Sequence, residues 1–334
     1  MHTRYKILKM LEEAPGQLIS GGQLAEALGI SRAAVWKQIA ALQGEGYDIA
    51  SQQGKGYLLT PGDVFVDYEI EKRLTTRVVG RPLICLPEVD STNTRLRQLA
   101  AEGAAHGTVV VSSHQTAGRG RMARRFESPK DQGVYLSVLL RSDLPLAELG
   151  TVTLLAAVVM ADTLEELTGI RPGIKWTNDI YLHGHKLCGI LTEGAVEGET
   201  GRLDYLVVGM GVNLYQRPED FPPEIRHIAG SVLGETGVRL NRAEYAACLM
   251  KHFEKWYLDG QFPQNREELL WRYREDLFFL GQMVEVHSFT ETYQALAEDI
   301  DGEGRLVVRR PDGRIEALNS GEISLKLPGV VQRS

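Results

Sequence analysis

A three-residue turn between two helical patterns near the N-terminus constrains the fold more than any other feature of the sequence. Residues 20–28 and 32–42 each have the apolar periodicity of a short helix, and Gly29-Ile30-Ser31 joins them. Gly29 permits a tight turn, and the Ser31 hydroxyl can accept a backbone N–H at the start of the following helix. We therefore expect a helix-turn-helix at about residues 21–40.

Two strand-like runs follow and predict a wing. Residues 47–51 and 57–59 are β-like and flank the turn Gly54-Lys55-Gly56. Thr60-Pro61-Gly62-Asp63 then interrupts both helix and strand, so it indicates a linker. The sequence thus predicts a winged helix-turn-helix domain over residues 1–62.

The charge of this N-terminal domain, called the head below, favours DNA binding only modestly. Residues 1–62 carry six Lys and Arg against five Asp and Glu, whereas the whole chain has a net charge of −7. Recognition helices and wings contact bases and phosphates, so the expected DNA contacts are Ser31, Arg32, Lys37 and Lys55. We expect Trp36, on the same helix, in the core. One head with so little net charge has weak non-specific affinity, which favours a dimer on two half-sites.

The rest of the chain predicts an α+β protein. From Ile84 onward, β-like and helical segments alternate over roughly 190 residues, as in a mixed α/β domain. From about Gln282 the pattern changes to short strands with tight turns, which suggests a small C-terminal β-barrel. The expected domains are residues 1–62, 63–280 and 281–334.

Cysteine spacing and hydropathy exclude several classes of protein. Cys85, Cys188 and Cys248 lie far apart without a CxxC pair, which argues against a zinc site or a secreted disulfide framework. The longest apolar stretch, residues 154–161, is too short to span a bilayer, and the N-terminus has no apolar signal segment. We expect a cytoplasmic protein with no membrane partner, and the sequence identifies no metal ligands.

An arginine-rich loop is the strongest local signal for chemistry. In TAGRGRMARR, residues 116–125, four arginines alternate with Gly118 and Gly120. Glycines let the backbone approach a ligand closely, and arginines offer forked donors to phosphate or carboxylate. The pattern predicts an anion-binding loop, and the alternative is a solvated basic turn. There is no Walker A or GxGxxG pattern, so a nucleotide would be held in another way.

Three further segments carry candidate ligand residues. Lys186 enters an apolar strand, where a lysine is costly to bury unless it meets an anion; the alternative is that it reaches water. Residues 90–93 open a helix with more polar groups than a cap needs, and Gln115 could join them. Residues 209–213 let the chain pass close to a flat ligand, with Asn213 able to read a base edge.

Taken together, these motifs resemble the biotin protein ligase family, including its members that also repress the biotin operon. The matching segments, in order, are SRAAVWKQI, GKGYLL, Ser91-Thr92-Asn93, Gln115 with AGRGR, KWTND with KLCGIL, GVN and SGEISL. The resemblance covers essentially the whole chain. It implies that the central domain has the fold shared by class II synthetases and biotin and lipoyl ligases.

The resemblance also implies a reaction and a set of residues. Members join biotin to ATP as biotinyl-5'-AMP and transfer biotin to a lysine of a biotin carboxyl carrier protein. Lys186 and Arg121 are then the catalytic residues. The implied biotin-binding residues are Ser91, Thr92, Asn93, Gln115, Gly118, Arg119, Gly120, Arg121, Lys186 and Gly189. The implied ATP-binding residues are Arg121, Phe126, Asn178, Asp179 and Asn213.

Further implied partners are Mg²⁺ with the triphosphate, operator DNA of biotin genes, and a homodimer formed when biotinyl-5'-AMP acts as corepressor.

Two alternative functions share parts of this pattern. Lipoyl-attaching enzymes have the same catalytic fold but usually lack a winged head. A transcription factor that only senses biotin would not need Arg119, Arg121 and Lys186 as transition-state cations.

The sequence departs from the family pattern at a few positions. Thr177 stands where most relatives have proline, and Phe126 where they have tryptophan. Met122-Ala123 replaces a stretch usually richer in Arg and Gly, and Ala295 stands where glycine is usual. The loop 116–125 and any dimer contact that depends on it are the features these departures affect most.

Overall fold

A capped helix-turn-helix forms as the local sequence predicts. Helix α2 (Gly21–Leu28) begins at a capping box made by Ser20 and the glutamine three residues later. Gly29 ends the helix in the left-handed region, at φ 63°, where a side chain would be strained. The Ser31 hydroxyl then accepts a backbone N–H 3.1 Å away at the start of α3 (Arg32–Gly44).

The wing and a third helix complete the core of this head. Strands β1 (Asp48–Gln52) and β2 (Gly56–Thr60) pair antiparallel around the expected turn. Helix α1 (Thr3–Glu12) packs against α2 and α3. Their apolar faces form one buried cluster that includes Ile7, Leu8, Leu24, Val35, Ile39 and Leu42. The apolar faces of the three helices therefore hold the head together.

The head extends beyond its expected boundary. The computed structural model describes residues 2–141, 144–196, 203–288, 291–319 and 322–325, and its contacts divide the chain into two units, Met1–Lys72 and Arg73–Ser334. Helix α4 (Asp67–Glu71) belongs to the first unit. The Tyr47 hydroxyl donates to Glu69 at 2.9 Å. Pro61-Gly62 thus ends strand β2, but the residues that follow still pack against the head.

A seven-stranded mixed sheet organises the second unit. Its strand order is β3-β4-β5-β9-β8-β7-β6, in which β3 and β4 are parallel and the other neighbours antiparallel. Strands β7 and β8 form an antiparallel hairpin around His183-Gly184-His185. The strands are β3 (Leu83–Leu86), β4 (Val109–Ser112), β5 (Gly133–Leu140), β6 (Gly173–Lys175), β7 (Asp179–Leu182), β8 (His185–Val196) and β9 (Leu203–Asn213).

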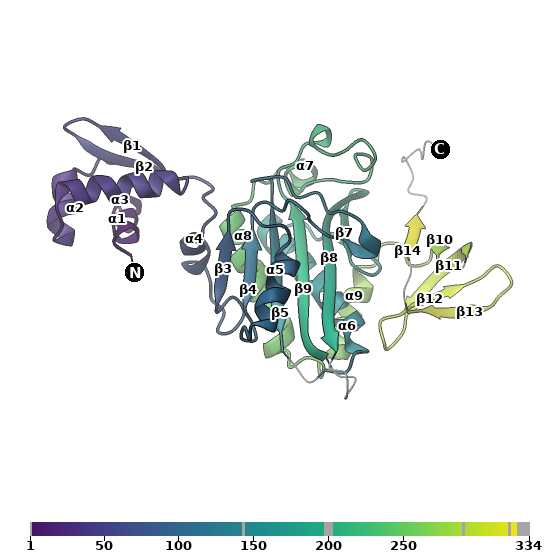
Figure 1. Ribbon diagram of the computed structural model, residues 1–334. Coiled ribbons are helices and arrows are strands. Elements are labelled where there is room, and N and C mark those ends of the chain that lie inside the picture. The colour runs from purple at the N-terminus through teal and green to yellow at the C-terminus, as the bar shows by residue number, and fades with distance from the viewer. Residues whose placement is uncertain (1, 142–143, 197–202, 289–290, 320–321, 326–334) are drawn as a thin grey trace. The chain divides into compact units, whose positions relative to one another are not determined.

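Helices cover both faces of this sheet. Figure 1 shows α5 in front of the sheet and α6, α8 and α9 behind it. Thirteen of the 21 residues of α6 are buried, including all of residues 151–161, so this helix forms the centre of the core. The helices are α5 (Thr92–Ala101), α6 (Glu148–Thr168), α7 (Val232–Thr236), α8 (Arg242–Glu254) and α9 (Arg266–Glu275), with short helical turns at Arg121–Ala123, Pro218–Asp220 and Lys255–Asp259.

The C-terminal strands form a second sheet within the same unit. They are β10 (Met283–His287), β11 (Thr292–Ile300), β12 (Leu306–Arg309), β13 (Ile315–Leu318) and β14 (Glu322–Leu325). Their hydrogen-bonded order is β13-β12-β11-β10-β14, which confirms a C-terminal domain rich in β-strands, and its closure into a small barrel stays a prediction. The Trp176 indole donates to Gly304 at 3.1 Å and links this sheet to the catalytic domain. Ser320 and Gly321 of the C-terminal motif lie outside the described residues.

None of the described helices combines the length and the apolar character needed to cross a membrane.

Candidate active site

A cavity of about 350 Å³ brings together almost all of the predicted ligand residues. The start of α5, the arginine-rich loop, the β7–β8 hairpin and the end of β9 line it. The predicted residues in its wall are Ser91, Thr92, Asn93, Gln115, Arg119, Gly120, Arg121, Phe126, Asn178, Asp179, Lys186, Gly189 and Asn213.

Gly118 is the predicted residue that does not line the cavity. A Cβ built on Gly118 would lie 2.4 Å from the Phe126 carbonyl oxygen and 2.7 Å from the Ser128 hydroxyl. The Phe126 N–H donates back to the Gly118 carbonyl at 3.1 Å. Gly118 is therefore needed for close backbone packing at the base of the loop.

A buried polar cluster forms one end of the cavity. The backbone N–H and the hydroxyl of Thr92 lie 2.9 and 3.2 Å from Gln115 Oε1. Gln115 Nε2 donates to Ser128 Oγ at 3.0 Å, and Ser137 Oγ lies 2.8 Å from Thr92 Oγ1. Because these groups are held by one another and lie under the surface, they present fixed donors and acceptors to a neutral polar ligand.

Asn93 has its polar atoms already paired within the protein. Its Nδ2 donates to the Leu191 carbonyl at 3.1 Å and to Glu193 Oε2 at 2.9 Å, and its Oδ1 accepts from Ser137 at 2.6 Å. A Cβ on Gly209 would lie 2.2 Å from Asn93 Oδ1, so the glycine makes room for this side chain. Asn93 thus fastens α5 to β8 at the cavity wall, and its contact with a ligand stays a prediction.

The arginine-rich loop folds back on itself over the cavity. Arg119 and Arg125 form an isolated antiparallel bridge, and the Gly120 N–H donates to the Arg124 carbonyl at 2.8 Å. Met122 has φ 54°. A side chain in that left-handed region costs about 1 kcal/mol relative to glycine.

The two predicted ligand arginines have different partners. Arg121 Nη1 donates to Thr177 Oγ1 at 2.7 Å and to Asn178 Oδ1 at 3.0 Å. Arg119 lies 3.1 Å from the Glu193 carboxylate and is 46% exposed. Arg121 therefore ties the loop to the β6–β7 turn through neutral groups, which leaves its charge free to meet an anion.

Lys186 does meet an anion, as its place in an apolar strand required. Its Nζ lies 2.6 Å from Asp179 Oδ1, and the two side chains are 29% and 19% exposed. A register shift between β7 and β8 at this point and backbone bonds to Ile228 and Gly230 hold the lysine at the cavity wall. An incoming carboxylate or phosphate would share the ammonium with Asp179.

Phe126 forms a flat apolar wall. A Cβ on Gly189 or Gly211 would lie 3.0 or 2.8 Å from its ring, so both glycines admit the ring against the sheet. The ring meets Tyr135 edge-on, with centroids 6.2 Å apart. Phenylalanine thus supplies the hydrophobic surface that tryptophan supplies in most relatives.

Asn213 lies at the opposite wall with both ends of its amide engaged. Its Nδ2 donates to the Gly230 carbonyl at 3.1 Å, and its Oδ1 accepts from Gln216 at 3.1 Å. One Nδ2 hydrogen and one oxygen lone pair are left for a ligand. Its role in reading adenine stays a prediction.

Sequence reasoning missed several residues of this site. Ser137 is fully buried in β5, and Glu193 joins Asn93 to Arg119. Ile225 and Ile228 add apolar lining from a loop that no motif marked. Of these residues, only Ser137 could have been noticed from the sequence, because it is a serine within the otherwise apolar and aromatic run GVYLSVLL.

The head presents the face expected to contact DNA. Arg32, Lys37 and Lys55 are exposed on α3 and at the tip of the wing, whereas the Ser31 hydroxyl is used as the helix cap. The expectation that Trp36 lies in the core is wrong, because it is 66% exposed on α3. The helix buries Val35, Ile39 and Leu42 instead, and Trp36 lies about a quarter turn away from that buried stripe, on the flank of the helix.

Three family models match successive parts of the chain. The biotin/lipoate A/B protein ligase family matches residues 85–213, an HTH domain matches residues 3–58, and the biotin protein ligase C-terminal domain matches residues 279–326. The C-terminal and HTH matches accompany the catalytic one, which favours a biotin over a lipoyl ligase.

Relatives confirm this over nearly the full length. The bifunctional ligase/repressor BirA of Bacillus subtilis is 38% identical, covering 96% of this chain and 98% of the relative, and that of Escherichia coli is 32% identical, covering 96% of both. The chain belongs to the biotin protein ligase family. The structure of the Aquifex aeolicus biotin protein ligase in complex with biotin and ATP has 29% identity and a TM-score of 0.60, covering 72% of this chain and 97% of that one.

One family departure has a structural consequence in this ligase. Thr177 replaces the proline of most relatives, and its hydroxyl accepts one of the two hydrogen bonds of Arg121. A proline has no side-chain acceptor. This chain therefore has an anchor for its loop that proline at the same position could not supply.

Proposed function

We propose that the cavity joins biotin to ATP as biotinyl-5'-AMP and then transfers biotin to a lysine of a biotin carboxyl carrier protein. The observation that carries the proposal is the convergence of Arg119, Arg121 and Lys186 on a cavity whose other end is neutral and polar. The biotin carboxylate and the α-phosphate repel each other, and cations between them offset that repulsion in the transition state.

Each part of the cavity has a role in this reaction. Thr92 and Gln115, with Ser91 beside them, hold the polar ring of biotin. Phe126 and the glycines behind it form a slot for flat groups. Lys186 contacts the carboxylate and then the bridging oxygen, where negative charge develops as the acyl–oxygen bond breaks. Arg121 closes the loop over the anhydride and excludes water.

The residues present also fit Mg²⁺ bound with the triphosphate. Such ions are held by one or two carboxylates together with substrate phosphates. Asp179 offers a carboxylate in the cavity wall, with the Asn178 amide beside it. When bound, the ion would neutralise phosphate charge, while Lys186 and Arg121 retain the roles described above.

The ligase activity is tested by incubating the full chain with biotin, ATP and a biotin carboxyl carrier protein, followed by mass measurement of the carrier. A gain of one biotinyl group is the expected result. A gain seen with lipoate instead would indicate a lipoyl ligase. No gain, with biotin still bound, would indicate a sensor without catalysis.

The head makes the same protein a repressor. We propose that biotinyl-5'-AMP promotes a homodimer that binds an inverted repeat near biotin genes. The exposed Arg32, Lys37 and Lys55 supply contacts to bases and phosphates, and two heads supply the affinity that one lacks. Footprinting upstream of biotin genes, with and without biotin and ATP, is the test. A footprint that is absent or equal in both conditions rules out control by the adenylate.

Replacing Trp36 by Ala should weaken operator binding by about tenfold while leaving ligase activity and thermal stability unchanged. An exposed tryptophan on a recognition helix can contact thymine methyl groups, and loss of recognition at one base pair typically costs about 1–3 kcal/mol. Binding to operator and to scrambled DNA would be compared, with Gln38→Ala on the same helix as control. Equal loss on both DNAs would show that Trp36 does not read sequence.

A further inference from the structure

Three metal-binding side chains meet between α6 and α8, on residues that the ligase reaction does not use. Cys248 and His252 lie four residues apart on α8 and so share one face of that helix. Glu166 of α6 lies opposite, with its Oε2 2.9 Å from His252 Nε2. The three ligand atoms all lie within 4.8 Å of one another.

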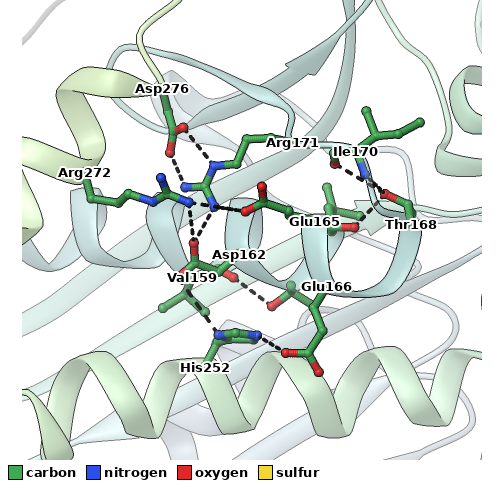
Figure 2. A network of polar contacts seen from close by, with 12 residues as sticks. Val159, Asp162, Glu165, Glu166, Thr168, Ile170, Arg171, His252, Arg272 and Asp276 are labelled. Carbon is green, nitrogen blue, oxygen red and sulfur yellow. Dashed lines mark hydrogen bonds and ion pairs between the residues drawn. The ribbon is translucent and has the colours of Figure 1, made fainter.

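The imidazole is also placed as a metal-bound histidine would be. Figure 2 shows His252 between Glu166 on one side and Asp162 on the other. Its Nδ1 is buried, has no hydrogen-bond partner and lies 4.0 Å from Asp162 Oδ2. Only 7% of His252 is exposed. Metal-ligating histidines generally direct their second ring nitrogen at a carboxylate, which fixes the ring and its tautomer.

That second carboxylate is itself held in place. The Trp256 indole donates to Asp162 Oδ2 at 2.7 Å, and the Arg171 guanidinium pairs with its other oxygen. Arg171 also bridges to Glu165 and Asp276, as Figure 2 shows. The cluster around His252 is therefore rigid on the side of Asp162, and its ligand atoms need only small movements to converge.

We propose that this cluster binds a divalent transition metal ion, Zn²⁺ by its ligand chemistry, through Cys248 Sγ, His252 Nε2 and Glu166 Oε2. Zn²⁺ accepts sulfur, nitrogen and oxygen ligands in a tetrahedral arrangement, whereas Mg²⁺ and Ca²⁺ take oxygen. A polar surface cavity of about 380 Å³, lined by Glu166 and His252 among others, leaves the fourth position to water.

Proton balance accompanies the binding. A metal-bound cysteine is a thiolate, and a metal-bound histidine is a neutral imidazole. Metal binding releases one proton from Cys248 to solvent, and the ring proton of His252 moves from Nε2 to Nδ1, facing Asp162. Lys251 already pairs with Glu166 Oε1, which leaves Oε2 for the ion.

The site would tie α6 to α8. Since α6 packs on β8, the strand that carries Lys186, the ion would stiffen the support of the active site without taking part in the reaction. The absence of a CxxC pair argued against a zinc site, but that argument covers only ligands that are close together in the sequence. Here the third ligand comes from a different helix.

Titration of the metal-free full chain with Co²⁺ tests the proposal. We expect a thiolate-to-cobalt absorption band that saturates at one equivalent and disappears when Zn²⁺ is added. One proton should be released per ion in weakly buffered solution. At about a hundredfold excess of Zn²⁺ over its Kd, the Tm should rise on the order of 5 °C.

Variants distinguish this site from adventitious binding. Cys248→Ser should lose the band and the Tm rise, whereas the matched control Cys85→Ser, at a cysteine on β3, should keep both. Glu166→Gln should weaken Co²⁺ binding about tenfold, the loss expected for one ligand. If Cys248→Ser fails to fold, His252→Gln replaces it. The absence of a thiolate band in the unaltered protein, or its persistence in Cys248→Ser or in the His252→Gln variant that replaces it, overturns the proposal.

Discussion

Replacing Lys186 by Ala is expected to lower the rates of adenylation and biotin transfer by about a hundredfold or more, with a much smaller change in biotin affinity. Removing one group that stabilises developing negative charge typically costs on the order of 10²–10³ in kcat. Lys186 sits at the cavity wall 2.6 Å from Asp179, so its charge is positioned where we propose that the anhydride forms. Its contribution therefore appears mainly in the transition state.

Single-turnover formation of adenylate, transfer to the carrier and equilibrium binding of biotin would be measured separately. Lys130→Ala, at an exposed lysine outside the cavity, is the control and should match the unaltered enzyme. Because the variant leaves Asp179 without its partner, the Tm is recorded as well, to separate misfolding from lost catalysis. Rates within about twofold of the unaltered enzyme, a difference of less than 1 kcal/mol, would contradict the role.

Replacing Arg121 by Gly should give an active enzyme that releases biotinyl-5'-AMP about tenfold faster than the unaltered chain. A tenfold faster release corresponds to an activation free energy lower by about 1.4 kcal/mol. Arg121 bonds to Thr177 and Asn178, which ties the loop to the sheet. Without the side chain, the loop opens more often and water and free amines reach the anhydride. The released adenylate should label lysines of bystander proteins.

Labelling of serum albumin in a mixture with the carrier measures this leak. Arg217→Gly, at an exposed arginine that pairs only with nearby acidic residues, serves as control. Thr177→Val removes one of the two anchors of Arg121, and we expect an intermediate leak from it. Labelling that stays confined to the carrier, at normal turnover, would show that Arg121 does not confine the adenylate.

Local features of this protein were readable from the sequence because their physical causes are local. Gly29 adopts a left-handed turn and Ser31 caps α3 through interactions that span three or four residues. The β7–β8 hairpin follows from strand patterns on either side of His183-Gly184-His185. The order of the motifs likewise identified the family, and the chemistry of the arginines and Lys186 indicated an anion site before any contact was known.

Tertiary structure alone decided which groups meet across long separations. It paired Thr92 and Asn93 with the buried Ser137, and it placed Trp36 outside the core, because Val35 and Ile39 already fill the inner face of that helix. It also extended the head to include α4, because apolar residues after Pro61 continue to pack against the core of the head. The meeting of Cys248 and His252 with Glu166 depends on how α8 packs against α6, and helix packing is set by the complementarity of two surfaces that no single stretch of sequence contains.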